Sequence, residues 1–257
     1  MLVLASASPR RRELLTQAGF TFEVHPAHIP EDPHPNEDPI AYVTRLAREK
    51  AQDVFRELTR PTDGPVSSSA LYQGTTSVVP QEPQIEPGAL APEERASTKL
   101  GAPSFRLLSG ERMRHNEPDG AQAPSAALQV LGADTTVTLD NHILGKPEDP
   151  ADAARMLRLL SGRTHRVITG VALVTASRTE VAAEATAVRF LTLSDQEIDA
   201  YIATGEPMDK AGAYAIQGHA ARWIPRIEGC YFNVVGLPIS LVSTLLESCQ
   251  LIDSPNR

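Results

Sequence analysis

Apolar and polar positions follow two different periods along this chain, and each period predicts one kind of element. Short runs rich in apolar and β-branched residues at 2–5, 129–139, 166–174 and 181–193 are typical of strands. From 39 to about 58, apolar residues recur at helical spacing, which predicts a long helix with one apolar face. Strands and helices in this mixed order predict an α/β fold, with a mixed central sheet flanked by helices.

Capping residues predict where further helices begin and end. Ser8 is a good N-cap, Pro9 suits the first helical position, and Gly19 closes this helix about three turns later. Similar signals bound helices at 149–162 and 194–205, and a capping box opens the second of these.

One long stretch, from about 61 to 127, has almost no periodic apolar residues. It is rich in Pro, Ser, Gly, Gln and Glu, and its only apolar cluster is Phe105, Leu107 and Leu108. Such a segment buries too little apolar surface to offset the entropy of ordering it. We interpret it as a disordered insertion in a single domain that spans 1–257. Without its 67 residues, 190 of the 257 remain for the folded body.

Composition and charge restrict the kinds of molecule that this chain is expected to bind. The net charge of −8 argues against a protein that binds long nucleic acids non-specifically, although local cations can still bind phosphates. The two cysteines form no CxxC pair, and the seven histidines show no HExxH spacing, so neither pattern indicates a zinc site. With no signal peptide and no apolar stretch near ~20 residues, we expect a cytoplasmic protein that has no membrane or nucleic-acid partner.

The first candidate site is the strand-to-helix junction that contains Ser8, Arg10 and Arg11. A helix start presents free N–H groups and a positive dipole end, which favour an anion. The two guanidinium groups match the oxygens of a phosphate. The alternative is that these arginines are simply solvated, as most charge runs are.

The second candidate is Asp134, a carboxylate in an otherwise apolar strand. Burial of such a group is costly unless it has a partner, and a metal ion or a positioned water is one possibility. The alternative is an aspartate at a turn or bulge that bonds to nearby backbone.

Two lysines and one glutamate are further candidates. Lys146 lies in a Gly-Lys-Pro loop after the predicted turn at Asp140-Asn141, where a rigid turn can hold its ammonium over a phosphate. Lys50 lies on the polar side of the 39–58 helix, which by itself predicts an ordinary surface lysine. Glu31, in a loop beside a proline, is likewise expected to be exposed.

The last candidate is the glycine-rich run from Asp209 to Gly218, which contains Lys210 and Gln217. Small residues there suit a close approach of backbone to ligand, and the amide of Gln217 can read a base edge. The alternative is a plain connecting loop.

Together these residues supply clustered cations, a lone strand carboxylate and no Cys or His nucleophile. This set suits cleavage of a phosphoanhydride by a metal-activated water, because that reaction needs charge neutralisation and a positioned water.

Eight blocks of this chain, in order, resemble the sequence motifs of the Maf family. They are Ser6-Ala7-Ser8-Pro9-Arg10-Arg11, Ala47-Arg48-Glu49-Lys50-Ala51, Gly132-Ala133-Asp134-Thr135, Gly145-Lys146-Pro147, Leu160-Ser161-Gly162, Asp209-Lys210-Ala211-Gly212-Ala213-Tyr214, Ile216-Gln217-Gly218 and Asn233-Val234-Val235-Gly236-Leu237-Pro238. The resemblance implies a nucleoside triphosphate pyrophosphatase that uses a divalent cation, Mg or Mn, in a deep cleft between two lobes.

The resemblance also implies roles for particular residues. Asp134 matches the family's proton acceptor and helps to hold the metal; Glu31 falls at an acidic metal-site position, although Pro30 stands where the family often has a second acid. Lys50 and Lys146 match phosphate-binding lysines. Ser8, Arg11 and Lys210 join them as expected substrate-binding residues.

Base choice in the family is linked to three positions, which Arg10, Thr135 and Gln217 match here. These residue types resemble the subgroup that hydrolyses dTTP and UTP rather than the 7-methyl-GTP subgroup. Two alternatives stay open: another modified nucleotide as substrate, and a non-catalytic nucleotide-binding regulator of septum formation. The resemblance further implies a homodimer, for which the apolar helix near 239–246 offers either an interface or more core.

Overall fold

The computed structural model describes residues 1–60 and 128–253, with side chains described up to Cys249. The insertion predicted at about 61–127 lies outside the described residues.

Within these residues, seven strands form one mixed sheet. They are β1 (Leu2–Leu4), β2 (Glu23–Val24), β3 (Gln129–Leu139), β4 (His142–Leu144), β5 (Thr164–Val174), β6 (Thr179–Arg189) and β7 (Arg226–Glu228). The order is β2-β1-β3-β5-β6-β7, and β4 pairs with the end of β3. The strands β2, β1 and β3 are parallel, whereas each pair from β3 through β5 and β6 to β7 is antiparallel. The predicted mixed α/β sheet is confirmed.

The helices begin where the capping residues predict. They are α1 (Pro9–Gln17), α2 (Pro39–Thr59), α3 (Pro150–Leu160), α4 (Asp195–Ile202), α5 (Tyr231–Val235) and α6 (Ile239–Asp253), with short 3-10 turns η1 (Glu206–Asp209), η2 (Ala211–Ala213) and η3 (His219–Trp223). Proline occupies the first turn of α1, α2 and α3, where its missing N–H costs nothing. The capping box of α4 is present, but the side chain of Ser8 makes no capping hydrogen bond to α1.

Two parts of the strand prediction differ from the structure. The strand expected at 181–193 begins earlier, at Thr179, and ends at Arg189; the chain leaves β5 beyond Phe190, where Leu191 N–H donates to Trp223 O. The short strand β4 was not predicted. It forms because Asp140 and Asn141, both at positive φ, turn the chain tightly back onto β3.

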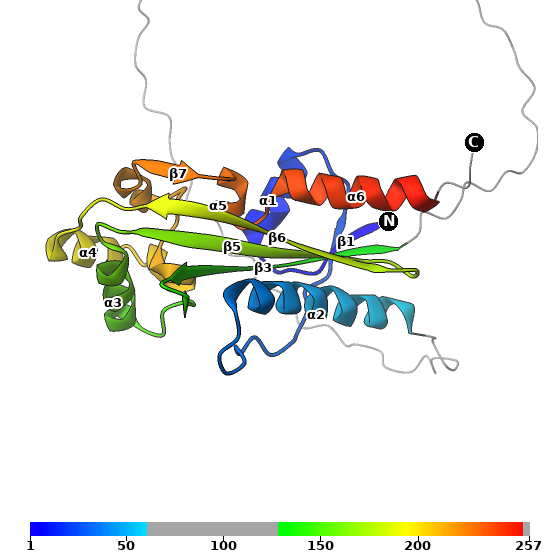
Figure 1. Cartoon of the computed structure of the whole chain (residues 1–257), viewed down its shortest axis with the longest axis horizontal. Helices are drawn as coiled ribbons and strands as arrows, with labels where there is room; N and C mark the ends of the chain where they lie inside the picture. The colour runs from blue at the N-terminus through cyan, green and yellow to red at the C-terminus, as the bar shows by residue number, and fades with distance from the viewer. Residues whose placement is uncertain (61–127, 254–257) are drawn as a thin grey trace, which may run out of the picture. The chain divides into compact units, whose positions relative to one another are not determined.

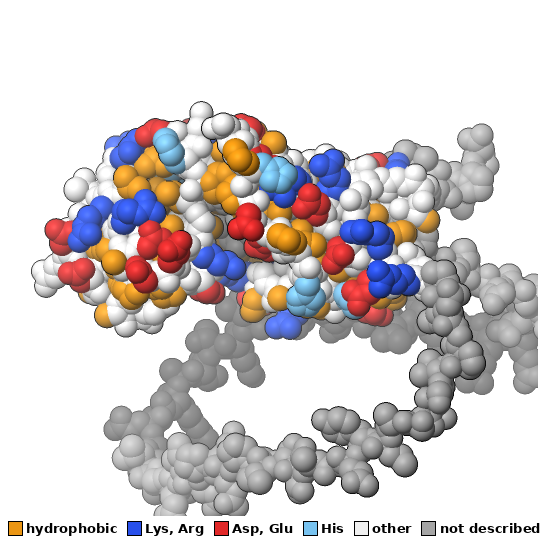
Figure 2. Space-filling model, turned by 90° about the horizontal axis from the view of Figure 1, so that it is seen from below, with side chains coloured by type: hydrophobic (Ala, Val, Ile, Leu, Met, Phe, Trp, Pro, Cys, Tyr) orange, Lys and Arg blue, Asp and Glu red, His pale blue; other side chains and the backbone are white. Residues whose placement is uncertain are grey.

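The helices cover both faces of the sheet. The long helix α2 lies along one face, whereas α1 and α6 lie on the other (Figure 1). Viewed from the side that α2 covers, acidic and basic side chains are interleaved over the surface (Figure 2). None of the helices in the described ranges is long and apolar enough to cross a lipid bilayer.

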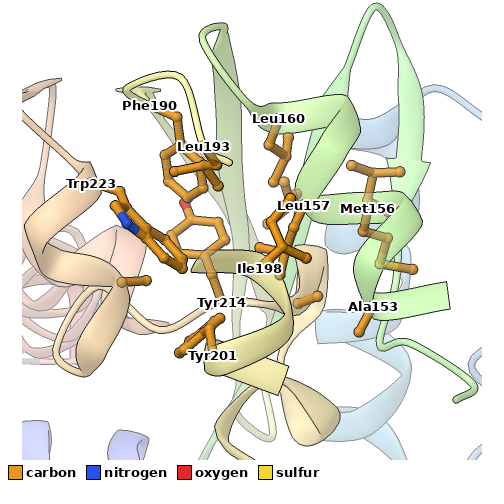
Figure 3. Packing of buried hydrophobic residues seen from close by; sticks show 14 of the residues in the cluster. Ala153, Met156, Leu157, Leu160, Phe190, Leu193, Ile198, Tyr201, Tyr214 and Trp223 are labelled. Atoms are coloured by element: carbon orange, nitrogen blue, oxygen red, sulfur yellow. The ribbon is translucent and has the colours of Figure 1, made fainter. Parts of the chain in front are cut away.

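The buried apolar residues form three clusters. One lies between α2 and the sheet, and one lies between the sheet and the helices α1, α5 and α6. The third fills the end of the molecule that carries α3 and α4 (Figure 3). In it, the rings of Phe190, Tyr214 and Trp223 meet edge-on or tilted, with Phe190 and Tyr214 centroids 4.8 Å apart. Such contacts add to the stabilisation from apolar burial itself.

Two glycines allow α2 to lie directly on the sheet. A Cβ built at Gly132 of β3 would stand 2.9 Å from Ala51 N and still closer to Ala47 O. A Cβ built at Gly170 of β5 would stand 2.7 Å from Thr44 N. No larger residue fits at either position without moving the helix backbone, so this close contact fixes the height of α2 above β3.

One edge of β3 stays open between two short partners. β1 pairs with residues 129–131 of β3, and β4 pairs with residues 137–139. Residues 132–136 therefore have no strand partner on that side within the described part of the chain. Asp134 and Thr135 lie in this gap on opposite faces of the sheet, because successive side chains of a strand alternate.

Candidate active site

A pocket of about 530 Å³ opens at the gap in the edge of β3. Its volume lies within the range of roughly 300–1,000 Å³ that is typical of small-molecule sites. The walls come from the β1–α1 loop, the loop that carries Glu31, α2, the middle of β3, the loop after β4, and the segments 209–211 and 234–236. Nine of the ten predicted site residues line it: Ser8, Arg10, Arg11, Glu31, Lys50, Asp134, Thr135, Lys146 and Lys210.

Gln217 is the predicted site residue that does not line the pocket. Its side chain is exposed, and it follows the segment that supplies Ala211 and Tyr214 to the lining. The base-reading role that the motif suggests for Gln217 stays a prediction.

At the centre of the pocket, one lysine lies between two carboxylates. The Nζ of Lys50 donates to Asp134 Oδ1 at 2.8 Å and lies 2.6 Å from Glu31 Oε1. The side chains of Lys50 and Asp134 are 9% and 11% exposed, whereas that of Glu31 is 53% exposed. Removal of either member of a buried pair leaves an uncompensated charge, so Lys50 and Asp134 depend on each other.

The prediction that Lys50 is an ordinary surface lysine is wrong. Because α2 rests on the glycines of β3 and β5, a side chain on the sheet-facing side of α2 reaches Asp134 directly. The expectation that a strand carboxylate needs a partner is confirmed, and the partner in this structure is the Lys50 ammonium. Glu31 is exposed, as expected, yet its carboxylate is paired with the Lys50 ammonium.

The two carboxylates differ in acidity although they share one lysine. Burial raises the pKa of Asp134 above its ordinary value, and the charges of Lys50 and Arg11 only partly oppose this effect. Burial also acts to raise the pKa of Glu31, but the hydrogen bond and charge of Lys50, with Lys146 and Arg11, outweigh it and lower the pKa. The raised pKa makes Asp134 the better proton acceptor of the two.

Arg11 is built into the wall of the pocket. Its guanidinium donates to Gly236 O at 2.9 Å, Ala133 O at 2.9 Å, Ser6 Oγ at 3.1 Å and Thr135 Oγ1 at 3.0 Å. These bonds use four of its five N–H groups. Burial lowers the pKa of Arg11 from its usual value. The phosphate-binding fork expected of Arg11 is thus not free in this structure, because the same donors join β1, β3 and α5.

Thr135 belongs to the same polar junction. Its hydroxyl accepts from Arg11 and lies 2.9 Å from the hydroxyl of Thr169. The Thr169 hydroxyl also donates to Asn233 O at 3.2 Å. The hydroxyl of Thr135 is therefore engaged in hydrogen bonds that hold the floor of the pocket together.

On the opposite wall, Asp209 pairs with two cations. It lies 3.6 Å from Arg10 and also bonds to Lys210. Burial acts to raise the pKa of Asp209, but Lys210 and Arg10 lower it overall. The N–H of Gly212 donates to Gly145 O at 3.0 Å, which ties this wall to the loop that carries Lys146. Lys146 itself is exposed at the mouth of the pocket.

The oxygen donors of the pocket suit a hard divalent cation. The carboxylates of Asp134 and Glu31 converge on one position, since both contact the Lys50 ammonium. Residues 1–60 and 128–249 contain no group of three or more His, Cys, Asp or Glu side chains that could hold a metal by themselves. Magnesium often binds through one or two carboxylates and completes its shell with water and substrate phosphates, so the residues present fit such an ion.

Sequence reasoning did not single out Tyr42 or Asp209, two polar residues that line the pocket. Tyr42 lines the pocket and donates from its hydroxyl to Glu31 O at 2.8 Å. It lies two turns before Lys50 on α2, so helical spacing from a recognised site residue could have found it. Asp209 directly precedes Lys210 within a recognised motif, but a surface aspartate beside a lysine is too common a pattern to single out.

Comparisons with known proteins give a consistent result. The family model described as Maf-like protein matches residues 1–249. A dTTP/UTP pyrophosphatase of Koribacter versatilis is 41% identical, over 98% of this chain and 95% of the relative. Relatives of the same name from Geobacter sulfurreducens and Bacillus pumilus are 41% and 37% identical, over 100% and 96% of this chain and 95% of each relative.

Proposed function

The chain belongs to the Maf family, and we propose that it is a pyrophosphatase that converts dTTP and UTP to the monophosphate and pyrophosphate. One observation carries the proposal: a buried carboxylate, Asp134, faces a pocket whose walls also carry lysines and arginines. This arrangement matches a reaction that needs one proton acceptor and much neutralisation of phosphate charge.

In the proposed reaction, Asp134 accepts a proton from a water that attacks the α-phosphorus. A new P–O bond forms to the oxygen of that water, and the bond between the α-phosphorus and the bridging oxygen breaks. Pyrophosphate leaves with the bridging oxygen and the electron pair of the broken bond. Lys50, Lys146 and Lys210 neutralise charge on the phosphates, because their ammonium groups line the same pocket. The raised pKa of Asp134 increases its affinity for the transferred proton.

A divalent cation, Mg or Mn, completes the proposed site. Asp134 and Glu31 would hold it, and it would supply charge neutralisation to the phosphate oxygens and lower the pKa of bound water. The Lys50 ammonium now lies between these carboxylates, so it would have to share them with the ion or turn toward the phosphates.

The pyrimidine preference rests on the relatives' names and on the family positions that Arg10, Thr135 and Gln217 match. Arg10 lines the pocket and can contact a ligand directly. Thr135 is hydrogen-bonded to Arg11, so it would influence base choice through the shape of the pocket floor. The test is a panel of purified triphosphates with Mg²⁺ or Mn²⁺. The proposal expects dTTP and UTP to be turned over fastest, and fastest turnover of 7-methyl-GTP would overturn the assigned base preference.

The substitution Asp134→Asn tests the assigned proton acceptor. We expect pyrophosphate release to fall by at least ~10²-fold, as on loss of a general base, with the fold retained because Glu31 still pairs with the Lys50 ammonium. Asp140→Asn is the matched control, because Asp140 closes the turn after the same strand and its side chain is exposed. Full activity of Asp134→Asn, with the control also active, would end this assignment. Nucleotide binding without turnover by the unmodified chain would favour the regulatory alternative.

We also propose a cytoplasmic location, where nucleoside triphosphates are made and used, and a homodimeric state. Sedimentation of the purified chain at several concentrations decides the second point, since a monomer at all concentrations would refute it.

A further inference from the structure

The segment that carries Glu31 has little regular structure of its own. Residues 25–38 connect β2 to α2 and contain no helix or strand. The carboxylate of Glu31 is half-exposed and contacts Lys50. An exposed carboxylate on such a loop holds one direction only if its backbone is fixed from elsewhere.

The backbone on either side of Glu31 is held by two side chains of α2. The hydroxyl of Tyr42 donates to Glu31 O at 2.8 Å, and Arg45 Nη2 donates to Asp32 O at 3.1 Å. Tyr42 and Arg45 are three residues apart and so lie on one face of the helix. The guanidinium of Arg45 also lies 5.7 Å from the centre of the Tyr42 ring.

Arg45 is itself fixed by a bidentate ion pair to the end of the same loop. Its Nε and Nη2 donate to the two oxygens of Glu37 at 2.7 and 2.8 Å, and Nη1 donates to Glu49 at 3.2 Å. The side chains of Arg45 and Glu37 are 13% and 10% exposed, so water screens this pair much less than a surface pair. Glu37 in turn accepts from the N–H of His34 at 2.9 Å.

Three side chains of α2 therefore act together on the segment around Glu31. Tyr42 and Arg45 hold the loop backbone at residues 31 and 32, and Lys50 receives the carboxylate of Glu31. The distance between Glu31 and Asp134 across the pocket is thus set by α2.

We propose that Arg45 and Tyr42 are positioning residues, which hold the loop 31–37 on α2 so that the Glu31 carboxylate faces Asp134 across the pocket. The effect on catalysis rests on the proposed function. The effect on cation binding rests on the proposed metal site, and the effect on the loop rests on neither.

The test uses the whole chain with Arg45→Gln, Glu37→Gln or Tyr42→Phe. Arg48→Gln is the matched control, because Arg48 is an exposed arginine on the same helix. Hydrogen exchange should become faster at the amides of His34 and Glu37, which are bonded within the loop, and should be unchanged in the control. The affinity for Mn²⁺ without nucleotide, measured by electron paramagnetic resonance, should fall roughly 10-fold, as is typical when partners of a metal ligand are removed.

Activity then separates positioning from a general loss of structure. For Arg45→Gln we expect kcat/KM to fall about 10-fold at limiting Mn²⁺ and to recover at saturating Mn²⁺, because Asp134 and Lys50 are intact. Tyr42→Phe removes a single oxygen and keeps the proposal testable if the charge variants fold poorly.

Unchanged exchange at His34 and Glu37 in both Arg45→Gln and Tyr42→Phe would overturn the proposal. So would faster exchange with unaltered Mn²⁺ affinity, because the loop would then move without affecting Glu31. If the unmodified chain releases no pyrophosphate from any triphosphate, the proposed function fails, while exchange and Mn²⁺ binding still decide the role of Arg45.

Discussion

The substitution Gly132→Ala tests whether the height of α2 above the sheet sets the geometry of the pocket. The new Cβ would stand 2.9 Å from Ala51 N and 3.0 Å from Ala51 Cβ, and closer still to Ala47 O. Carbon atoms ordinarily meet at ~3.5–4.0 Å, so α2 has to move away by about 1 Å. The atoms in the way are mostly backbone atoms, so a change of rotamer cannot relieve the clash.

This displacement has a calculable effect at the reacting groups. Lys50 lies between Ala47 and Ala51 on the same helix, and with its side-chain conformation unchanged its bond to Asp134 would lengthen from 2.8 Å to about 3.8 Å, beyond hydrogen-bonding distance. A misplacement of about 1 Å at a catalytic group can cost ~10²-fold in rate. Overpacking of this kind costs about 1–3 kcal/mol of folding free energy, which leaves most of the protein folded.

The assay combines urea unfolding with pyrophosphate release from dTTP. Gly19→Ala is the matched control, because Gly19 has a φ of +81° and a Cβ added there would meet no other atom within 4 Å. That control should lose about 1 kcal/mol of stability through backbone strain and keep its activity. If Gly132→Ala has unchanged kcat although it is destabilised, the close contact of α2 with β3 does not control the pocket.

Three further predictions concern buried polar groups. Burial lowers the pKa of His165 from 6.5 to about 4, so the unfolded chain binds a proton at this residue before the folded chain does as pH falls. The free energy of unfolding should therefore drop by up to about 3 kcal/mol between pH 6.5 and 4. Urea midpoints of His165→Phe should decline less steeply over this range. Arg11→Lys loses at least one of four hydrogen bonds, at about 1.5–3 kcal/mol each, so thermal unfolding should occur at lower temperature and a normal melting temperature would refute the structural role. Asn233→Leu removes two buried hydrogen bonds, from the Asn233 amide to Val167 O and to Thr186 Oγ1, both 2.9 Å long. The urea midpoint should therefore fall by the equivalent of about 1–3 kcal/mol, and an unchanged midpoint would contradict this account.

Local signals in the sequence were enough to predict most helices and strands. The N-caps at Ser8, Asp149 and Ser194 mark the starts of α1, α3 and α4, because capping depends on residues within a single turn. The strand β3 has the predicted bounds, since an apolar run of that length is recognisable without its neighbours. The end of β6 was not predictable, because it depends on the carbonyl of Trp223, which a distant part of the chain supplies.

The residues of the site could also be predicted from the sequence, mainly through the family motifs. Those motifs named Asp134, Lys146 and Lys210, and the structure gathers them around one pocket. Their chemical roles await the experiments above.

The sequence by itself determined most of the helices and long strands and, through the family motifs, most of the charged residues of the pocket, because these signals depend on neighbours along the chain. Only the tertiary structure decided which charges meet. Lys50 and Asp134 are 84 positions apart, and Arg11 and Gly236 are 225 apart. Their contacts exist because α2 lies close on the glycines of the sheet and because β1 stops short along β3. The polarity of Lys50 predicts solvent exposure, and the carboxylates of Asp134, on a distant strand, and of Glu31, in the loop before α2, stabilise its burial.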